Sequence, residues 1–173
     1  KADIITPILV LTIICLVASA ALALTNSLTQ PVIEQAAAQR ADEVRIAVMP
    51  GAKGFEKIEV AGIPTTVAEV YRETSGEGYV FTVLSKGYGG DITILCGIGP
   101  DGRITACMAL SHTETVGIGS KIDTEEYRGQ YTGQDASLNG VSAISGATVS
   151  SKAYERAIRD VFLAYDAAKE AAS

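Results

Sequence analysis

The chain has 173 residues, enough for one domain and an appendage. Its 14 basic and 20 acidic residues give a net charge of −6, which argues against nucleic-acid binding because phosphate contacts need a basic surface. Hydrophobic residues make up 47% of the chain, more than a disordered protein contains. One His and three scattered Cys leave little material for a metal cluster, so we expect no metal site.

Residues 4–24 form an uninterrupted stretch without a charged side chain. At about 1.5 Å per residue, a helix of this length crosses the hydrocarbon core of a bilayer, so we predict a transmembrane helix. A cleaved signal peptide is the alternative, because residues 18–20 read Ala-Ser-Ala, but the stretch is longer than the core of about 7–15 residues in a signal peptide. Lys1 precedes the stretch and the next basic residue is Arg40, so the positive-inside rule predicts a cytoplasmic N-terminus and an extracytoplasmic body.

Residues 25–50 are predicted to form a connecting helix, because Pro31 can open a helix and strong helix formers follow it. Short segments with strand character come next, separated by turn residues. These segments are Ile58–Val60, Thr66–Tyr71, Tyr79–Leu84, Ile92–Ile98 and Ile104–Leu110. The turn Gly99-Pro100-Asp101-Gly102 joins the last two as a hairpin. The order of the elements predicts an α+β fold, in which helices pack an antiparallel sheet within residues 51–173.

The final helix is predicted over Ser151–Ala172 from the helical spacing of its apolar residues. One face collects Tyr154, Ala157, Ile158, Val161, Phe162 and Tyr165. We expect this face to cover the sheet.

The cysteines offer little chemistry. Cys15 lies in the apolar N-terminal stretch, and the chain has no Cys-x-x-Cys motif. Cys96 and Cys107 lie on neighbouring predicted strands, where a disulfide can form outside the cell, but the expected register offsets them by one residue. Burial of both as small hydrophobic residues is the favoured interpretation.

Two segments are candidates for ligand binding. The first is Ser111–Gly119, where His112 and Glu114 stand beside glycines that let the backbone approach a ligand. A plain connecting loop is the equal alternative. The second is Ile144–Ser151, which leads directly into the final helix. Ser150 or Ser151 can be the N-cap of that helix, or the helix N-terminus can be a phosphate site. The Walker lysine pattern is absent from the sequence, which argues against a nucleoside triphosphatase.

Ser145-Gly146-Ala147-Thr148-x-Ser150 resembles the S-G-A-T-x-S/T signature of the FMN-binding domain family. Further matches to the family pattern are His112-x-Glu114-Thr115-x-Gly117-x-Gly119, Gly87–Ile92, Asp101-Gly102-x-Ile104, Tyr127, Tyr131 and Gly133. Val116 and Ile118 depart from it, because the family has proline and leucine there. The resemblance implies that a flavin transferase joins the FMN phosphate to Thr148. It implies further cofactor contacts from Ser145, Gly146, Ala147, Ser150, Ser151, His112, Glu114, Thr115 and Gly117.

With its predicted N-terminal anchor, the chain resembles the G subunits of Rnf-type complexes, which couple ferredoxin:NAD+ electron transfer to ion translocation. The related C subunits of Na+-translocating NADH:quinone reductases are the alternative. The resemblance implies an electron-transfer subunit with membrane and peripheral partner subunits, which has no catalytic residue of its own and does not turn over alone. A non-redox anchored binding domain and a stand-alone flavin reductase are competing classes, and flavin content and turnover by the isolated domain distinguish them.

Overall fold

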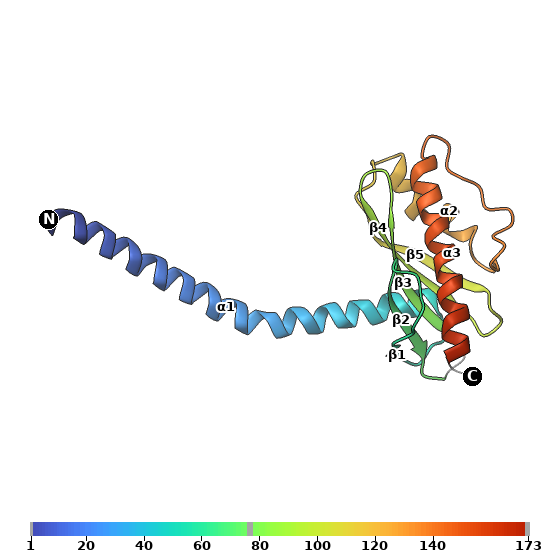
Figure 1. Cartoon of the computed structure of the whole chain (residues 1–173), viewed down its shortest axis with the longest axis horizontal. Coiled ribbons are helices and arrows are strands. Elements are labelled where there is room, and N and C mark those ends of the chain that lie inside the picture. The colour runs from blue at the N-terminus through green and yellow to red at the C-terminus, as the bar shows by residue number, and fades with distance from the viewer. Residues whose placement is uncertain (1, 76–77, 172–173) are drawn as a thin grey trace. The chain divides into compact units, whose positions relative to one another are not determined.

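The computed structural model describes residues 2–75 and 78–171, without the side chains of residues 2–7, 24, 26–28 and 30–41. The chain divides into two units, residues 1–41 and 42–173. One helix, α1 (Ala2–Val48), contains nearly all of the first unit and ends within the second (Figure 1). The helices expected at residues 4–24 and 25–50 are therefore stretches of one continuous helix, which ends at Val48, two residues before the predicted end.

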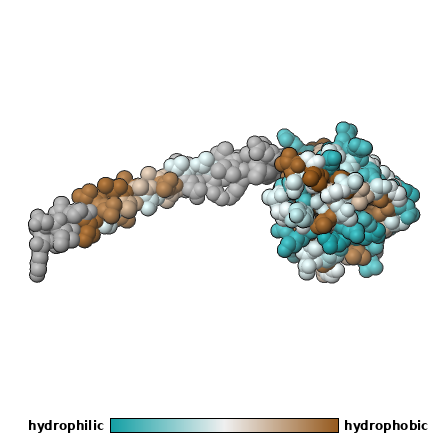
Figure 2. Space-filling model, turned by 90° about the horizontal axis from the view of Figure 1, so that it is seen from above, coloured by the Kyte–Doolittle hydropathy of each residue, from teal (hydrophilic) through white to brown (hydrophobic). Residues whose placement is uncertain are grey.

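The N-terminal part of α1 is rich in exposed apolar side chains (Figure 2). Their exposed fractions run from 49% for Val10 to 72% for Leu22. Residues 4–7 and 24 of the expected transmembrane segment lie outside the side chains that the structure describes. Among the described residues, no helix combines the length and the apolar character that a bilayer crossing requires. The transmembrane helix therefore stays a prediction.

The second unit contains a five-stranded antiparallel sheet in which each strand pairs with the next along the chain. Its strands are β1 (Phe55–Ile58), β2 (Val67–Glu73), β3 (Tyr79–Lys86), β4 (Asp91–Ile98) and β5 (Ile104–Ser111). The expected α+β class with an antiparallel sheet is confirmed. The first strand lies earlier than the predicted Ile58–Val60, because its pairing with β2 runs from Phe55 to Ile58.

The two faces of the sheet are covered by different elements. Alternate residues of a strand point to opposite faces, so Phe81 of β3 joins the main core beneath α3 (Thr148–Ala171), while Val80 faces the other way. On that second face Val80 packs with Val48 at the end of α1 and with Met49. The Thr105 hydroxyl of β5 also donates a hydrogen bond to the Val48 carbonyl. The predicted apolar face of the last helix is buried, as expected.

Cys96 of β4 and Cys107 of β5 are direct partners across the sheet. The expected one-residue offset between them is wrong, because the register shifts at a bulge between Gly97 and Ile98. Counted outward from the β4–β5 turn, that shift offsets the pairs from Gly97–Ala106 to Ile94–Ala109 by one residue and brings the two cysteines opposite each other; a second shift follows between Ile94 and Thr93. Both side chains are buried, as the favoured interpretation of the sequence predicted.

Two short elements connect β5 to the last helix and were not predicted from the sequence. They are the 3₁₀ helix η1 (Gly119–Asp123) and α2 (Glu125–Gly129). The Thr124 hydroxyl caps α2 by accepting a hydrogen bond from the Tyr127 N–H, at 3.4 Å. Both elements are too short to show a hydrophobic period, so the pattern of apolar residues could not indicate them.

Candidate functional site

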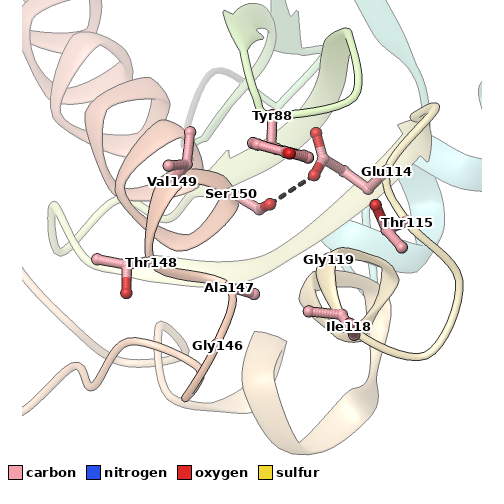
Figure 3. A pocket seen from close by; sticks show the side chains of 10 residues that line it. All are labelled: Tyr88, Glu114, Thr115, Ile118, Gly119, Gly146, Ala147, Thr148, Val149 and Ser150. Carbon is pink, nitrogen blue, oxygen red and sulfur yellow. Dashed lines mark hydrogen bonds between the residues drawn. The ribbon is translucent and has the colours of Figure 1, made fainter.

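A cavity of about 510 Å³ opens at the start of α3, within the usual size range of ligand sites (Figure 3). Three segments that are distant in sequence form it: the β3–β4 turn, the loop after β5, and the turn that leads into α3. The residues that line it are Tyr88, Glu114, Thr115, Ile118, Gly119, Gly146, Ala147, Thr148, Val149 and Ser150. The topology therefore brings together the two ligand-binding candidates identified in the sequence.

The first turn of α3 presents backbone N–H groups to this cavity. The helix begins at Thr148, and the first helical hydrogen bond runs from the Ser151 N–H to the Ala147 carbonyl, at 3.0 Å. Ala147 thus takes the N-cap position, where its methyl side chain cannot accept a hydrogen bond. The expected cap at Ser150 or Ser151 is wrong, because both serines lie inside the helix and are buried. The orphan N–H groups of the first turn suit an anionic ligand.

Glu114 is a buried carboxylate at the base of the cavity, only 6% exposed. One carboxylate oxygen, Oε1, accepts a hydrogen bond from the Gly89 N–H at 3.0 Å, and Oε2 accepts one from the Ser150 hydroxyl. Figure 3 shows Glu114 and Ser150 pointing toward each other. A Cβ atom on Gly119 would lie 2.6 Å from Oε2, and one on Gly87 would lie 2.1 Å from Oε1. Glycine at these two positions therefore allows the carboxylate to sit between the loops.

The electrostatics of the cavity follow from this carboxylate. Of the residues that line the cavity, Glu114 alone carries a charge. Its partner Ser150 lies in the first turn of α3, so the positive end of the helix dipole faces the buried negative charge. The hydrogen bonds from Gly89 and Ser150 replace part of the lost hydration. Glu114 thus ties three chain segments together at the site.

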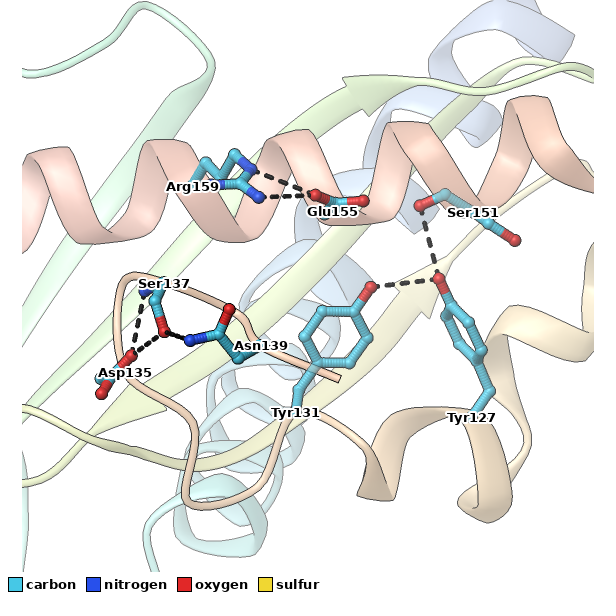
Figure 4. Close-up of polar contacts among 8 residues, drawn as sticks. All are labelled: Tyr127, Tyr131, Asp135, Ser137, Asn139, Ser151, Glu155 and Arg159. Carbon is cyan, nitrogen blue, oxygen red and sulfur yellow. Dashed lines mark hydrogen bonds and ion pairs between the residues drawn. The ribbon is translucent and has the colours of Figure 1, made fainter. Parts of the chain in front are cut away.

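A cluster of three tyrosines supports the first turn of α3 from below. Tyr127 donates a hydrogen bond to the Ser151 carbonyl at 3.3 Å, and its hydroxyl lies 3.1 Å from the Tyr131 hydroxyl (Figure 4). The Tyr154 ring packs against both, with ring centroids 5.5 and 5.1 Å away. Burial raises the pKa of all three phenols above the ordinary value, because the ionised form loses its hydration.

Six of the residues expected to hold a cofactor line the cavity: Glu114, Thr115, Gly146, Ala147, Thr148 and Ser150. The others do not. The Ser151 hydroxyl accepts a hydrogen bond from the Ile144 N–H at 3.0 Å, and His112 Nδ1 accepts one from the Glu114 N–H at 3.4 Å. Ser145 and Gly117 are exposed outside the lining. The side chains of His112 and Ser151 thus make local hydrogen bonds outside the cavity lining, and their cofactor contacts stay a prediction.

Four residues of the lining were not predicted as site residues: Tyr88, Ile118, Gly119 and Val149. Tyr88 is 74% exposed, Val149 51% and Ile118 49%. All four stand inside segments that the sequence had already pointed to, Tyr88 in Gly87–Ile92 and the others in Ser111–Gly119 and Ile144–Ser151, so position in a motif was a usable signal. Large exposed apolar side chains around a cavity are typical of a surface that covers a flat, partly apolar ligand.

Metal binding finds no support in the described part of the chain, where no three His, Cys, Asp or Glu side chains gather into a possible ligand set. Organic ligands fit the cavity better, because its lining combines hydroxyls, backbone N–H groups and apolar side chains.

The profile of the FMN-binding domain family matches residues 87–162, a range that contains every residue of the cavity lining. A relative from Methanosarcina acetivorans, named as the G subunit of an ion-translocating oxidoreductase complex, is 37% identical over 84% of this chain and 86% of its own length. The G subunit of the Na+-translocating ferredoxin:NAD+ oxidoreductase complex of Acetobacterium woodii is 32% identical, over 84% and 83%. The G subunit of the proton-translocating ferredoxin:NAD+ oxidoreductase complex of Clostridium ljungdahlii is 28% identical, over 87% and 85%.

Proposed function

Because this chain belongs to the family of G subunits of ion-translocating oxidoreductase complexes, we propose that it is an electron-transfer subunit carrying covalently bound FMN. The complex is of the Rnf type, in which electron transfer between ferredoxin and NAD+ drives ion translocation. The observation that carries the proposal is an exposed threonine, Thr148, at an uncapped helix start inside the range matched by the FMN-binding domain. Residues 51–173 are proposed as the FMN-binding domain.

The residues of the cavity fit the FMN phosphate. The N–H groups of the first turn of α3 and the positive end of its helix dipole would hold a phosphate attached to Thr148. Esterification of the Thr148 hydroxyl leaves one negative charge on the phosphate, which suits this position. Since Thr148 is exposed, a flavin transferase can reach its hydroxyl without unfolding the domain.

The isoalloxazine ring finds apolar partners in the same cavity. Tyr88, Ile118 and Val149 offer exposed apolar surface, while Thr115 offers a hydroxyl. Bound FMN supplies one- and two-electron redox chemistry, and the protein supplies binding and electrostatics. The buried Glu114 carboxylate lines the same cavity and would disfavour extra negative charge on a flavin bound there. No catalytic dyad is required for electron transfer, and the subunit is not expected to turn over alone.

We place the domain at a membrane through residues 4–24. The support is the run of exposed apolar side chains that includes Ile8, Leu11, Ile14 and Val17, because such side chains are unfavourable in water. Lys1 on the N-terminal side favours a cytoplasmic N-terminus and an FMN domain on the extracytoplasmic face. The partners are then membrane and peripheral subunits of the complex. Retention of the full chain in membranes after alkaline carbonate washing tests the tether, and release into the wash contradicts it.

The covalent flavin is tested on the full chain produced together with a flavin transferase. After denaturation, the chain should give a fluorescent gel band and a mass increased by one FMN. Thr148→Ala should lose both signals. Thr115→Ala is the matched control, since it removes a threonine hydroxyl from the same cavity and should keep both. Flavin that stays attached to denatured Thr148→Ala, or a wild-type chain without flavin, contradicts the proposal.

A further inference from the structure

Two buried cysteines face each other in the middle of the sheet, away from the residues that line the candidate site. Cys96 of β4 and Cys107 of β5 are Cα partners in the register, and their Sγ atoms lie 2.6 Å apart. Their side chains are 0% and 4% exposed. Their contact lies in the stretch of constant register between Ile94 and Gly97, which is bounded by register shifts at Thr93/Ile94 and Gly97/Ile98.

The register places the two cysteines at positions that a disulfide can span. Residues directly opposite each other in antiparallel strands have Cα atoms about 4.5–5.5 Å apart, inside the range of about 4.4–6.8 Å that disulfides span. The two sulfur atoms already point at each other, so bond formation needs no movement of either strand. A cysteine pair that only fills space has no need for this alignment, since small apolar residues in any register would fill the same volume.

We propose that Cys96 and Cys107 form a cross-strand disulfide in the mature protein, an inference that rests on the extracytoplasmic position of the domain in the proposed function. The two S–H bonds break and one S–S bond forms. The two protons and two electrons pass to a protein disulfide oxidant, whose own disulfide becomes two thiols through a mixed-disulfide exchange.

Burial of the two cysteines in the core determines at which stage of folding this exchange can take place. Burial raises the pKa of the Cys107 thiol, and the thiolate is the form that reacts. The pair belongs to the core that includes Tyr154 and Ile158 of α3, so an oxidant reaches the sulfur atoms before the helix covers the sheet. Once the core has closed, the same burial protects the disulfide from reduction. The bond then ties β5, which leads into the Glu114 loop, to its neighbour β4.

Cys15 provides an internal reference for the experiment. It lies in the apolar segment, is exposed, and stands far from the pair in sequence. The full chain is taken from the membranes of the producing cells, denatured in excess maleimide reagent without reductant, and weighed as an intact protein. We expect one label per chain without reductant and three labels after reduction.

Two variants make the count specific. Cys15→Ser should take no label before reduction and two afterwards. Cys107→Ala should take two labels with or without reductant, because Cys96 has lost its partner. Three labels on the unreduced wild-type chain overturn the proposal. Flavin fluorescence of the same chain on a denaturing gel tests the FMN proposal separately. A missing disulfide therefore does not imply a missing flavin, and a missing flavin does not imply a missing disulfide.

A second measurement follows the thermal unfolding of the wild-type full chain. Closing the short loop between the two cysteines restricts the unfolded chain, so a chain that is unfolded in urea, reduced and refolded with reductant present should melt roughly 5–15 °C below the untreated chain. The same treatment should leave the melting temperature of Cys107→Ala unchanged. An equal shift, or no shift, in both proteins overturns the proposal.

Discussion

The first turn of α3 and its later turns belong to one helix but differ in what holds them in place. The first turn exposes Thr148 and Val149 at the cavity and is fixed by the hydrogen bond from Ser150 to Glu114. The later turns bury one face, from Ala153 to Ala168, in the main core. Apolar packing sets the later turns, and polar contacts with two distant loops set the first. Stability and cofactor attachment should therefore respond to different substitutions.

Alkaline pH should have the largest effect on the buried face, through Tyr127, Tyr131 and Tyr154. Their pKa values in the folded protein are raised by burial, so the unfolded chain loses these protons first. Stability is complete below the unfolded pKa of about 10 and falls above it, by about 1.4 kcal/mol per pH unit for each tyrosine. Urea unfolding followed by circular dichroism between pH 8 and 12 measures this slope.

Tyr154→Phe is the matched variant for this pH dependence. The Tyr154 hydroxyl is buried without a hydrogen-bond partner, so its removal should leave stability at neutral pH unchanged or increase it. The same variant should lose less stability above pH 10, because one buried phenol no longer ionises on unfolding. A steeper alkaline loss in Tyr154→Phe would contradict the role assigned to burial.

Ile158→Ala should weaken the later turns strongly. Ile158 is fully buried on the core-facing side of α3. Truncation of such a residue lowers the free energy of unfolding by about 2–5 kcal/mol, because burial is lost and a cavity is left. Leu163→Ala on the same helix is the control, since Leu163 is 59% exposed and its loss should cost less than about 0.5 kcal/mol. Chains that remain folded should still attach flavin. Equal losses from the two variants would show that the helix does not pack as described.

The same contrast explains how much the sequence could predict. All six residues assigned to the apolar face are buried, because a period of 3.6 residues is a local property of the chain. The start of the helix was placed three residues too late. Ser150 and Ser151 have the side chains of N-caps, but their hydroxyls are used by Glu114 and Ile144, which are contacts with other segments. Single-residue preferences cannot reveal such distant partners.

In the sheet, too, local features were predictable from the sequence and contacts between distant segments were not. Strand positions followed from alternation and turn residues, and β2 to β5 lie close to their predicted ranges. The pairing of Cys96 with Cys107 did not follow, because the register shift between Gly97 and Ile98 offsets the neighbouring pairs by one residue. Tyr88 was missed as a site residue because its role depends on the β3–β4 turn meeting the start of α3.

Gly119→Ala should disturb the first turn while leaving the later turns intact. The added methyl group would lie 2.6 Å from Glu114 Oε2 and 3.0 Å from the Ser150 hydroxyl, so the carboxylate must move. We expect a loss of about 1–3 kcal/mol and a lower yield of covalent flavin per folded chain. Gly129→Ala is the control, because nothing lies within 4 Å of the added atom. Urea unfolding and gel fluorescence give the two readouts; normal flavin yield in Gly119→Ala would mean that Glu114 does not organise the site.

Ala147→Ser should separate the two ends of α3 most finely, although its effect is the smallest. A serine hydroxyl at the N-cap can accept a hydrogen bond from an N–H of the first turn, which should stabilise the flavin-free chain by about 0.5–1 kcal/mol. The same hydroxyl competes with the FMN phosphate for that N–H group, so the rate of flavin attachment should fall. Ala171→Ser, at the exposed last residue of α3, is the control and should change neither quantity by a comparable amount. An unchanged or faster rate of attachment in Ala147→Ser would mean that the FMN phosphate does not bind these N–H groups. The serine hydroxyl would then not compete with the phosphate.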